Sequence, residues 1–117
     1  MMTESEKTAV WGEVFAVRYL RRKGYRILDI NYLCKSGEID IVATRHGVVC
    51  FAEVKTRSEN TYFPPADAVD ERKQTNIKNS AASFMAAAKL GYETRFDIIE
   101  VILDDKNYKI RHTENAF

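Results

Sequence analysis

Three ionisable residues of complementary types follow one another along two neighbouring β-strand segments of the sequence. Asp40 is followed, after twelve intervening residues, by Glu53, and Lys55 comes two positions later. Carboxylates are natural ligands of a hard divalent cation such as Mg²⁺ or Mn²⁺. Such a cation neutralises the negative charge that develops when a phosphodiester bond is hydrolysed. The Lys55 ammonium is suited to orient or deprotonate the attacking water, or to stabilise the pentavalent state.

The segments that carry these residues are predicted to form a β-hairpin. Residues 37–45 and 48–57 have the apolar character and length of strands, and a His-Gly pair between them suits a tight turn. Side chains alternate between the two faces of a strand, so Glu53 and Lys55 are expected on the same face. The hairpin is therefore expected to hold the acids and the lysine in fixed positions.

The surroundings of Asp40 and Glu53 are apolar. Asp40 lies between two isoleucines at the centre of a β segment. Ionised groups are seldom buried there without partners. Two carboxylates and an ammonium that converge would neutralise one another or hold a divalent metal, with the backbone carbonyl of Val54 as a third oxygen ligand. The alternative is an edge hairpin on which Glu53 and Lys55 form a surface salt bridge.

A first helix is predicted from about Thr3 to Lys23, with Gly24 as its stop signal. Apolar residues at helical spacing form its inward stripe, on which Glu13 is the exception. In one interpretation Glu13 bends outward to water. In the other it leans over the sheet towards the acids of the hairpin, where it would be an outer ligand of the metal.

A second helix is predicted from about Ala66 to Leu90, closed by Gly91, after a polar connection at residues 58–65. That connection is long enough to form a flap over a site, and it can equally be a plain link. Lys73 falls on the inward side of the second helix. Its side chain either extends to solvent along the apolar surface or directs its ammonium at a phosphate.

The remaining segments predict further strands at residues 25–35, 94–103 and 108–112. The order α-β-β-β-α-β-β indicates an α/β fold, with a mixed central sheet of about five strands and the helices packed against it. With 117 residues, 45% of them apolar, the chain is expected to form a single domain over 1–117. The last strand is expected at an edge of the sheet, where it offers a pairing surface for a homodimer.

Composition narrows the class of protein. The two cysteines, Cys34 and Cys50, have no partner at metal-ligand spacing along the sequence, so they are interpreted as reduced thiols. Reduced thiols, the lack of an apolar N-terminal signal and the lack of a membrane-length apolar segment indicate a cytoplasmic protein without membrane contact. The formal net charge of +1 neither requires nor excludes nucleic acid.

An ordered set of short motifs points to a known family. The motifs are Gly12-Glu13, Gly24-Tyr25, Asn31-Tyr32, Gly37-Glu38-Ile39-Asp40, Glu53-Val54-Lys55-Thr56-Arg57, Arg95-Phe96-Asp97 and Asn115-Ala116-Phe117. In these motifs the chain resembles the YraN family of small bacterial proteins, which is similar to archaeal Holliday-junction resolvases of the PD-(D/E)XK, or restriction-endonuclease-like, superfamily. The resemblance implies a restriction-endonuclease-like three-layer core and a site at Glu13, Asp40, Glu53 and Lys55.

These patterns lead to a first hypothesis, a Mg²⁺- or Mn²⁺-dependent endonuclease that acts on DNA, with branched or damaged DNA as candidate substrates. Arg57, Arg72 and Lys73 bracket the expected site and are the predicted nucleic-acid contacts. No base-reading motif is visible, which favours recognition of the backbone or of shape. A nucleic-acid-binding module that keeps the fold without cutting is the second hypothesis, and an interaction protein that uses its surface is the third.

Overall fold

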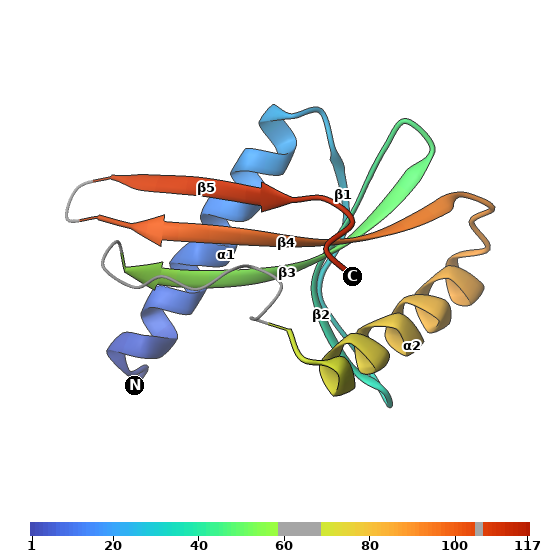
Figure 1. The fold of residues 1–117 in the computed structure, drawn as a ribbon, viewed down its shortest axis with the longest axis horizontal. Coiled ribbons are helices and arrows are strands. Elements are labelled where there is room, and N and C mark those ends of the chain that lie inside the picture. Colours follow the sequence, from blue (N-terminus) through green and yellow to red (C-terminus); the bar gives the residue numbers. More distant parts are fainter. Residues whose placement is uncertain (59–68, 105–106) are drawn as a thin grey trace.

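The computed structural model describes residues 1–58, 69–104 and 107–117. Within these residues the elements are α1 (Glu4–Arg22), β1 (Arg26–Cys34), β2 (Gly37–Arg45), β3 (Val48–Ser58), α2 (Glu71–Ala88), β4 (Glu93–Leu103) and β5 (Tyr108–Thr113) (Figure 1). The predicted order of helices and strands is confirmed. The expected connection at 58–65 lies outside the described residues, except for Ser58. Neither helix combines the length and the apolar character needed to cross a membrane.

The described strands form one five-stranded sheet in the order β1-β2-β3-β4-β5. The β3–β4 pair is parallel and the other three pairs are antiparallel, so the predicted mixed sheet of about five strands is confirmed. Parallel neighbours need a crossover connection, and α2 lies in that connection. The β2–β3 hairpin turns at His46 and Gly47, which both have positive φ angles of 53° and 75°, as a twisted hairpin requires.

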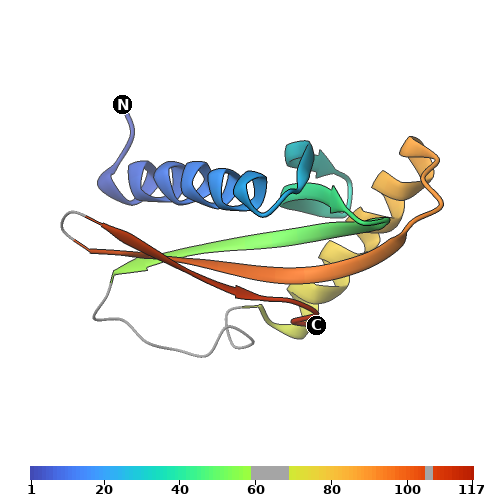
Figure 2. The same ribbon diagram turned by 90° about the horizontal axis from the view of Figure 1, so that it is seen from above.

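The two helices cover opposite faces of the sheet (Figure 2). On one face, Ala16 and Leu20 of α1 pack with Cys50 and Ala52 of β3. On the other face, Ile77 and Ala81 of α2 belong to a cluster that includes residues of β2, β3 and β4. This three-layer arrangement agrees with the fold that the sequence predicts.

Helix α2 differs from the prediction at both ends. It ends at Ala88 rather than at Leu90, and Lys89, not Gly91, adopts the left-handed conformation that closes it, with φ of 55°. At the other end Asp70 is the N-cap, and its side chain accepts a hydrogen bond from the Lys73 amide. The helix therefore begins at Glu71 rather than at about Ala66, and residues 66–68 lie outside the described part of the chain. Capping, which depends on backbone conformation, therefore sets both boundaries.

Candidate active site

The candidate site lies where strands β2 and β3 separate. Backbone pairing between them runs from Ile41 to Arg45 on β2, so Asp40 lies just beyond the paired segment. In place of a backbone partner, the Val54 amide donates to Asp40 Oδ2 at 2.8 Å. Figure 1 shows β2 turning away from β3 on this side of the sheet. The Asp40 side chain thus completes the hydrogen bonding of β3 at the fork between the strands.

A cavity of about 310 Å³ opens at this fork. Acids from three different elements line it, namely Glu13 of α1, Asp40 of β2 and Glu53 of β3. Glu13 therefore turns towards the acids of the hairpin, and of its two interpretations the structure supports this one. A second cavity, of about 300 Å³, is lined by Asp40, Glu53 and Lys73 among others. Asp40 and Glu53 line both cavities, so they can be reached from either side of the fork.

The close approach of α1 to β3 brings Glu13 into the cavity. Gly12 packs directly against Thr56, and a Cβ atom at position 12 would lie only 1.7 Å from Thr56 Oγ1. No side chain larger than hydrogen fits there without movement of one of the two elements. The absence of a side chain at Gly12 therefore allows the next residue, Glu13, to reach the fork.

The acids of the site make one another harder to ionise, which raises their pKa values. Burial and, second, the negative charge of Glu53 raise the pKa of Asp40 to about 7. Burial and the nearby Glu38 raise the pKa of Glu13 as well. In the orientation that satisfies its hydrogen bonds, the Asn31 amide nitrogen lies 2.7 Å from Glu13 Oε1. Like charges crowded at a partly buried site raise pKa values in this way, and a bound cation would relieve the repulsion.

Two lysines lie beside these acids. Lys73 Nζ lies 2.7 Å from Glu53 Oε1. Burial opposes the charge of Lys73, but the hydrogen bond to Glu53, the negative charge of Glu53 and smaller contributions from Lys55 and Asp40 together outweigh burial and raise the pKa of Lys73. For Lys55, burial and the positive charge of Lys73 lower the pKa. The structure therefore brings Lys55 and Lys73 together with Asp40 and Glu53, and pairs Lys73 with a carboxylate rather than leaving it to extend freely into solvent.

The donor set at the fork fits a hard divalent cation. Asp40 and Glu53 supply carboxylate oxygens from adjacent strands. The N–H and C=O of one residue in an extended strand point to the same side, so the Val54 carbonyl faces the same gap as its amide, which bonds Asp40. Among the described residues, Glu13, Asp40 and Glu53 do not bring three ligand atoms within 4.8 Å of one another. The candidate ligands are therefore two carboxylates and one carbonyl, with Glu13 as a more distant acid that lines the same cavity.

The residues predicted to contact phosphate lie in different surroundings. Arg57 has 8% of its surface exposed and lies 3.1 Å from Glu100 Oε1, in a buried ion pair. Arg57 lines neither cavity at the fork. Its surroundings indicate a structural role rather than contact with a phosphate. Arg72 is exposed on the first turn of α2, next to Lys73. Lys73 lines one of the two cavities and is paired with Glu53, whereas Arg72 lines neither cavity.

Sequence reasoning missed a second polar cluster, on the opposite face of the sheet. Cys50, Asp97 and His112 bring three potential metal-ligand atoms within 4.8 Å of one another, the one such group among the described residues. The sequence indicates an ordinary thiol at Cys50, because the three residues are far apart in the chain. A signal was present in Arg95-Phe96-Asp97, since two opposite charges two positions apart share one face of a strand.

Together these features define an α/β protein in which two helices enclose a five-stranded mixed sheet, with acids and lysines gathered where two strands separate. The chain belongs to the uncharacterised protein family UPF0102, whose family model matches residues 12–101. This finding confirms the resemblance to the YraN-like family.

Several relatives match over nearly their whole length. A UPF0102 protein of Alkaliphilus oremlandii is 45% identical over 97% of this chain and 99% of its own. A UPF0102 protein of Clostridium acetobutylicum is 41% identical over 97% of this chain and 95% of its own. A third, from Caldanaerobacter subterraneus, is 43% identical over 91% and 90% of the two chains. These matches establish family membership and leave the activity to be argued from the site.

Proposed function

We propose that the protein is a metal-dependent endonuclease of the PD-(D/E)XK, restriction-endonuclease-like class, which hydrolyses phosphodiester bonds of DNA, with branched or damaged DNA as the expected substrates. The observation that carries the proposal is the meeting of Asp40 and Glu53 at one fork, with Lys55 and Lys73 beside them. Acids and amines drawn from separate elements to one cavity are typical of a catalytic site.

In this proposal Asp40, Glu53 and the Val54 carbonyl hold Mg²⁺ or Mn²⁺. When bound, the ion would neutralise the negative charge that develops on the phosphate in the transition state. Glu13 lines the same cavity, where it acts as an outer ligand. The chemistry of the donors supports a hard cation, because every atom offered is oxygen.

Lys55 is the proposed catalytic amine. Burial and the charge of Lys73 lower the pKa of Lys55, which increases the share of neutral amine available to accept a proton from water. Lys55 follows Glu53 by two positions on β3, so both side chains point to the same face of the strand. Lys55 thus orients or deprotonates the attacking water, or stabilises the pentavalent state.

Lys73 and the exposed Arg72 are the proposed contacts to the phosphate backbone of DNA. Both lie on the first turn of α2, whose N-terminus also favours negative charge. Cutting both strands of a duplex requires two sites or two visits, so a homodimer is part of the proposal. The free edge of β5, which pairs only with β4 among the described strands, is its candidate contact.

The direct test incubates the purified chain with four-way junction, flap, duplex and single-stranded DNA in Mg²⁺ or Mn²⁺. Cleavage of at least one of these substrates is expected, and Asp40→Asn or Lys55→Ala should abolish it. Glu93→Gln, which changes an exposed acid at the start of β4, is the matched control and should cut normally. Failure to cut any substrate, or cutting that survives both substitutions, would reject the proposal.

One observation favours a second candidate, a nucleic-acid-binding module that retains the fold without cutting. The Lys73 ammonium already neutralises Glu53 at 2.7 Å, as a site without a metal would require. For this candidate we expect salt-dependent DNA binding together with no heat of Mg²⁺ or Mn²⁺ binding in calorimetry.

A further inference from the structure

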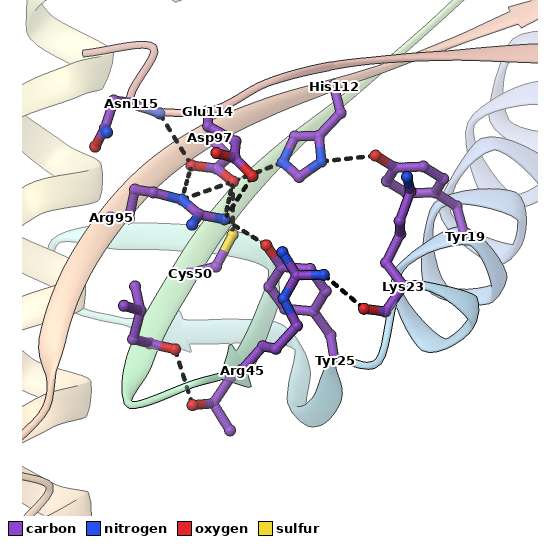
Figure 3. A network of polar contacts seen from close by, with 12 residues as sticks. Tyr19, Lys23, Tyr25, Arg45, Cys50, Arg95, Asp97, His112, Glu114 and Asn115 are labelled. Atoms are coloured by element: carbon purple, nitrogen blue, oxygen red, sulfur yellow. Dashed lines mark hydrogen bonds and ion pairs between the residues drawn. The ribbon is translucent and has the colours of Figure 1, made fainter.

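A sulfur, a nitrogen and an oxygen ligand meet on the face of the sheet that α1 covers (Figure 3). Cys50 Sγ of β3 lies 3.1 Å from Asp97 Oδ2 of β4. His112 Nε2 of β5 lies 2.6 Å from the same oxygen. Cys50 and Asp97 are fully buried, and the His112 side chain is 8% exposed. Three strands thus direct three different ligand atoms to one buried point, on the face opposite to α2 and the Lys73–Glu53 pair.

We propose that Cys50, Asp97 and His112 form a binding site for a divalent transition-metal ion, with Zn²⁺ as the ion that this ligand set favours. Thiolate, imidazole and carboxylate are the side chains that bind Zn²⁺ in proteins. Around a tetrahedral zinc ion, such ligand atoms lie about 3.3–3.6 Å apart. The two hydrogen-bonded pairs therefore need to separate by less than about 1 Å to admit the ion.

Binding of the ion displaces protons from the ligand atoms. Burial, and next the charge of Asp97, raise the pKa of the Cys50 thiol, which is therefore protonated in the metal-free protein. On binding, the sulfur loses this proton to solvent as the sulfur–metal bond forms. Nε2 of His112 binds the ion without a proton, and the Tyr19 hydroxyl, 2.9 Å from Nδ1, is placed to accept the hydrogen that Nδ1 then carries. Binding of the ion therefore releases protons, the thiol proton of Cys50 among them.

Neighbouring groups already hold the ligands in position. The Arg95 Nε–H donates to Asp97 Oδ1 at 2.9 Å, and the Asn115 amide donates to the same oxygen at 3.2 Å. These bonds leave Oδ2 directed at Cys50 and His112 (Figure 3). Tyr19 in turn fixes the imidazole ring of His112. Outer partners of this kind orient the ligands of metal sites in proteins.

Arg95 also limits the affinity of the site. Its Nη2 donates to Asp97 Oδ2 at 2.8 Å, so its positive charge lies close to the incoming ion. The guanidinium keeps other partners when the ion binds, because Nε holds Oδ1 and Nη2 also donates to the Tyr25 hydroxyl. We therefore expect weaker binding than at a zinc site without a neighbouring cation.

The proposed role is structural. The ion would join β3, β4 and β5, and β5 is otherwise an edge strand held by one neighbour among the described strands. Because the ligand atoms are buried, the ion is expected to enter during folding rather than by diffusion into the folded protein. The site is independent of the proposed nuclease centre, since Glu53 is paired with Lys73 of α2 on the other face.

The test refolds the full-length chain with Zn²⁺, with Co²⁺ or with a chelator, and then removes unbound ions. We expect one zinc per chain by elemental analysis, release of protons on binding, and a thiolate-to-cobalt charge-transfer band in the near ultraviolet. Cys50→Ser and His112→Gln should weaken Co²⁺ binding about tenfold or more. Cys34→Ser, which changes the other thiol, and Glu53→Gln at the nuclease centre are the controls and should keep the band.

Two results would overturn the proposal. The first is a wild-type chain that retains no zinc after refolding and gives no cobalt band, which would mean that the cluster is a hydrogen-bond network only. The second is a cobalt band that persists in Cys50→Ser. If that variant does not fold, the elemental analysis and the spectrum of the wild-type chain still decide the question.

Discussion

The ammonium nitrogen of Lys73 on α2 lies 2.7 Å from Glu53 Oε1 on β3. This ion pair connects a helix on one face of the sheet to a proposed metal ligand at the fork of the strands. The Lys73 side chain is 41% exposed and the Glu53 side chain is 8% exposed. A cation that binds Glu53 must therefore compete with Lys73, whereas a DNA phosphate near Lys73 would draw the ammonium away from the carboxylate.

Replacing Lys73 by methionine removes the competing charge and keeps most of the side-chain volume. We expect the affinity for Mn²⁺, measured by calorimetry without DNA, to rise about threefold to tenfold, because a partly exposed ion pair is weak. DNA affinity should fall in the same variant. Lys78→Met is the matched control, since Lys78 lies over the Phe96 and Phe117 rings rather than at Glu53. Unchanged Mn²⁺ affinity in Lys73→Met would show that the pair does not oppose the metal.

Metal binding should depend on pH through Asp40. Its pKa is raised from 3.8 to about 7 by burial and by the charge of Glu53, and the metal requires the ionised carboxylate. Mn²⁺ affinity should therefore be low at about pH 6 and higher at about pH 8, as calorimetry at the two pH values would measure. Equal affinity at both would contradict this assignment.

The same pKa shift predicts the pH dependence of the metal-free protein. Between its unfolded value of 3.8 and about 7, Asp40 binds more proton in the native state than in the unfolded state. Its contribution to the free energy of unfolding is therefore present at low pH and is lost as pH rises through about 7. Asp40→Asn should remove this slope, which urea unfolding across the pH range would measure.

The contact between Gly12 and Thr56 should be intolerant of a methyl group. A Cβ at position 12 would lie 1.7 Å from Thr56 Oγ1 and 2.9 Å from Thr56 Cβ, so Gly12→Ala should lower the free energy of unfolding by about 1–3 kcal/mol. Adding Thr56→Gly should restore part of the loss. Gly91→Ala is the control, because nothing lies within 4 Å of a Cβ there. Urea unfolding of the four chains tests this, and equal loss at Gly12 and Gly91 would refute it.

The two arginines that the sequence predicts as phosphate contacts should behave differently. Arg57→Ala leaves Glu100 buried without its main partner, so the free energy of unfolding should fall by about 2–4 kcal/mol. Arg72→Ala changes an exposed side chain and should alter stability by less than about 0.5 kcal/mol. DNA binding should weaken for Arg72→Ala, with the salt slope reduced by about one. If the Arg57→Ala variant were stable but bound DNA more weakly, Arg57 would be a DNA contact instead.

Much of the fold could be predicted because the relevant signals are local. The alternation of residues 37–57 and the His46-Gly47 turn specify a hairpin through φ preferences and side-chain direction alone. The order of helices and strands follows from the same kind of pattern. The end of α2 could not be predicted in this way, because Lys89 rather than the expected Gly91 takes the left-handed conformation.

The sequence by itself determined which residues can do chemistry, in that Asp40, Glu53 and Lys55 share a hairpin whose geometry is set locally. Only the tertiary structure decided which charges meet. It paired Lys73 with Glu53, enclosed Arg57 with Glu100, and brought Cys50 to Asp97 and His112. These contacts join segments far apart in the chain. They depend on the crossover and on the packing of helices against the sheet, which no local pattern encodes.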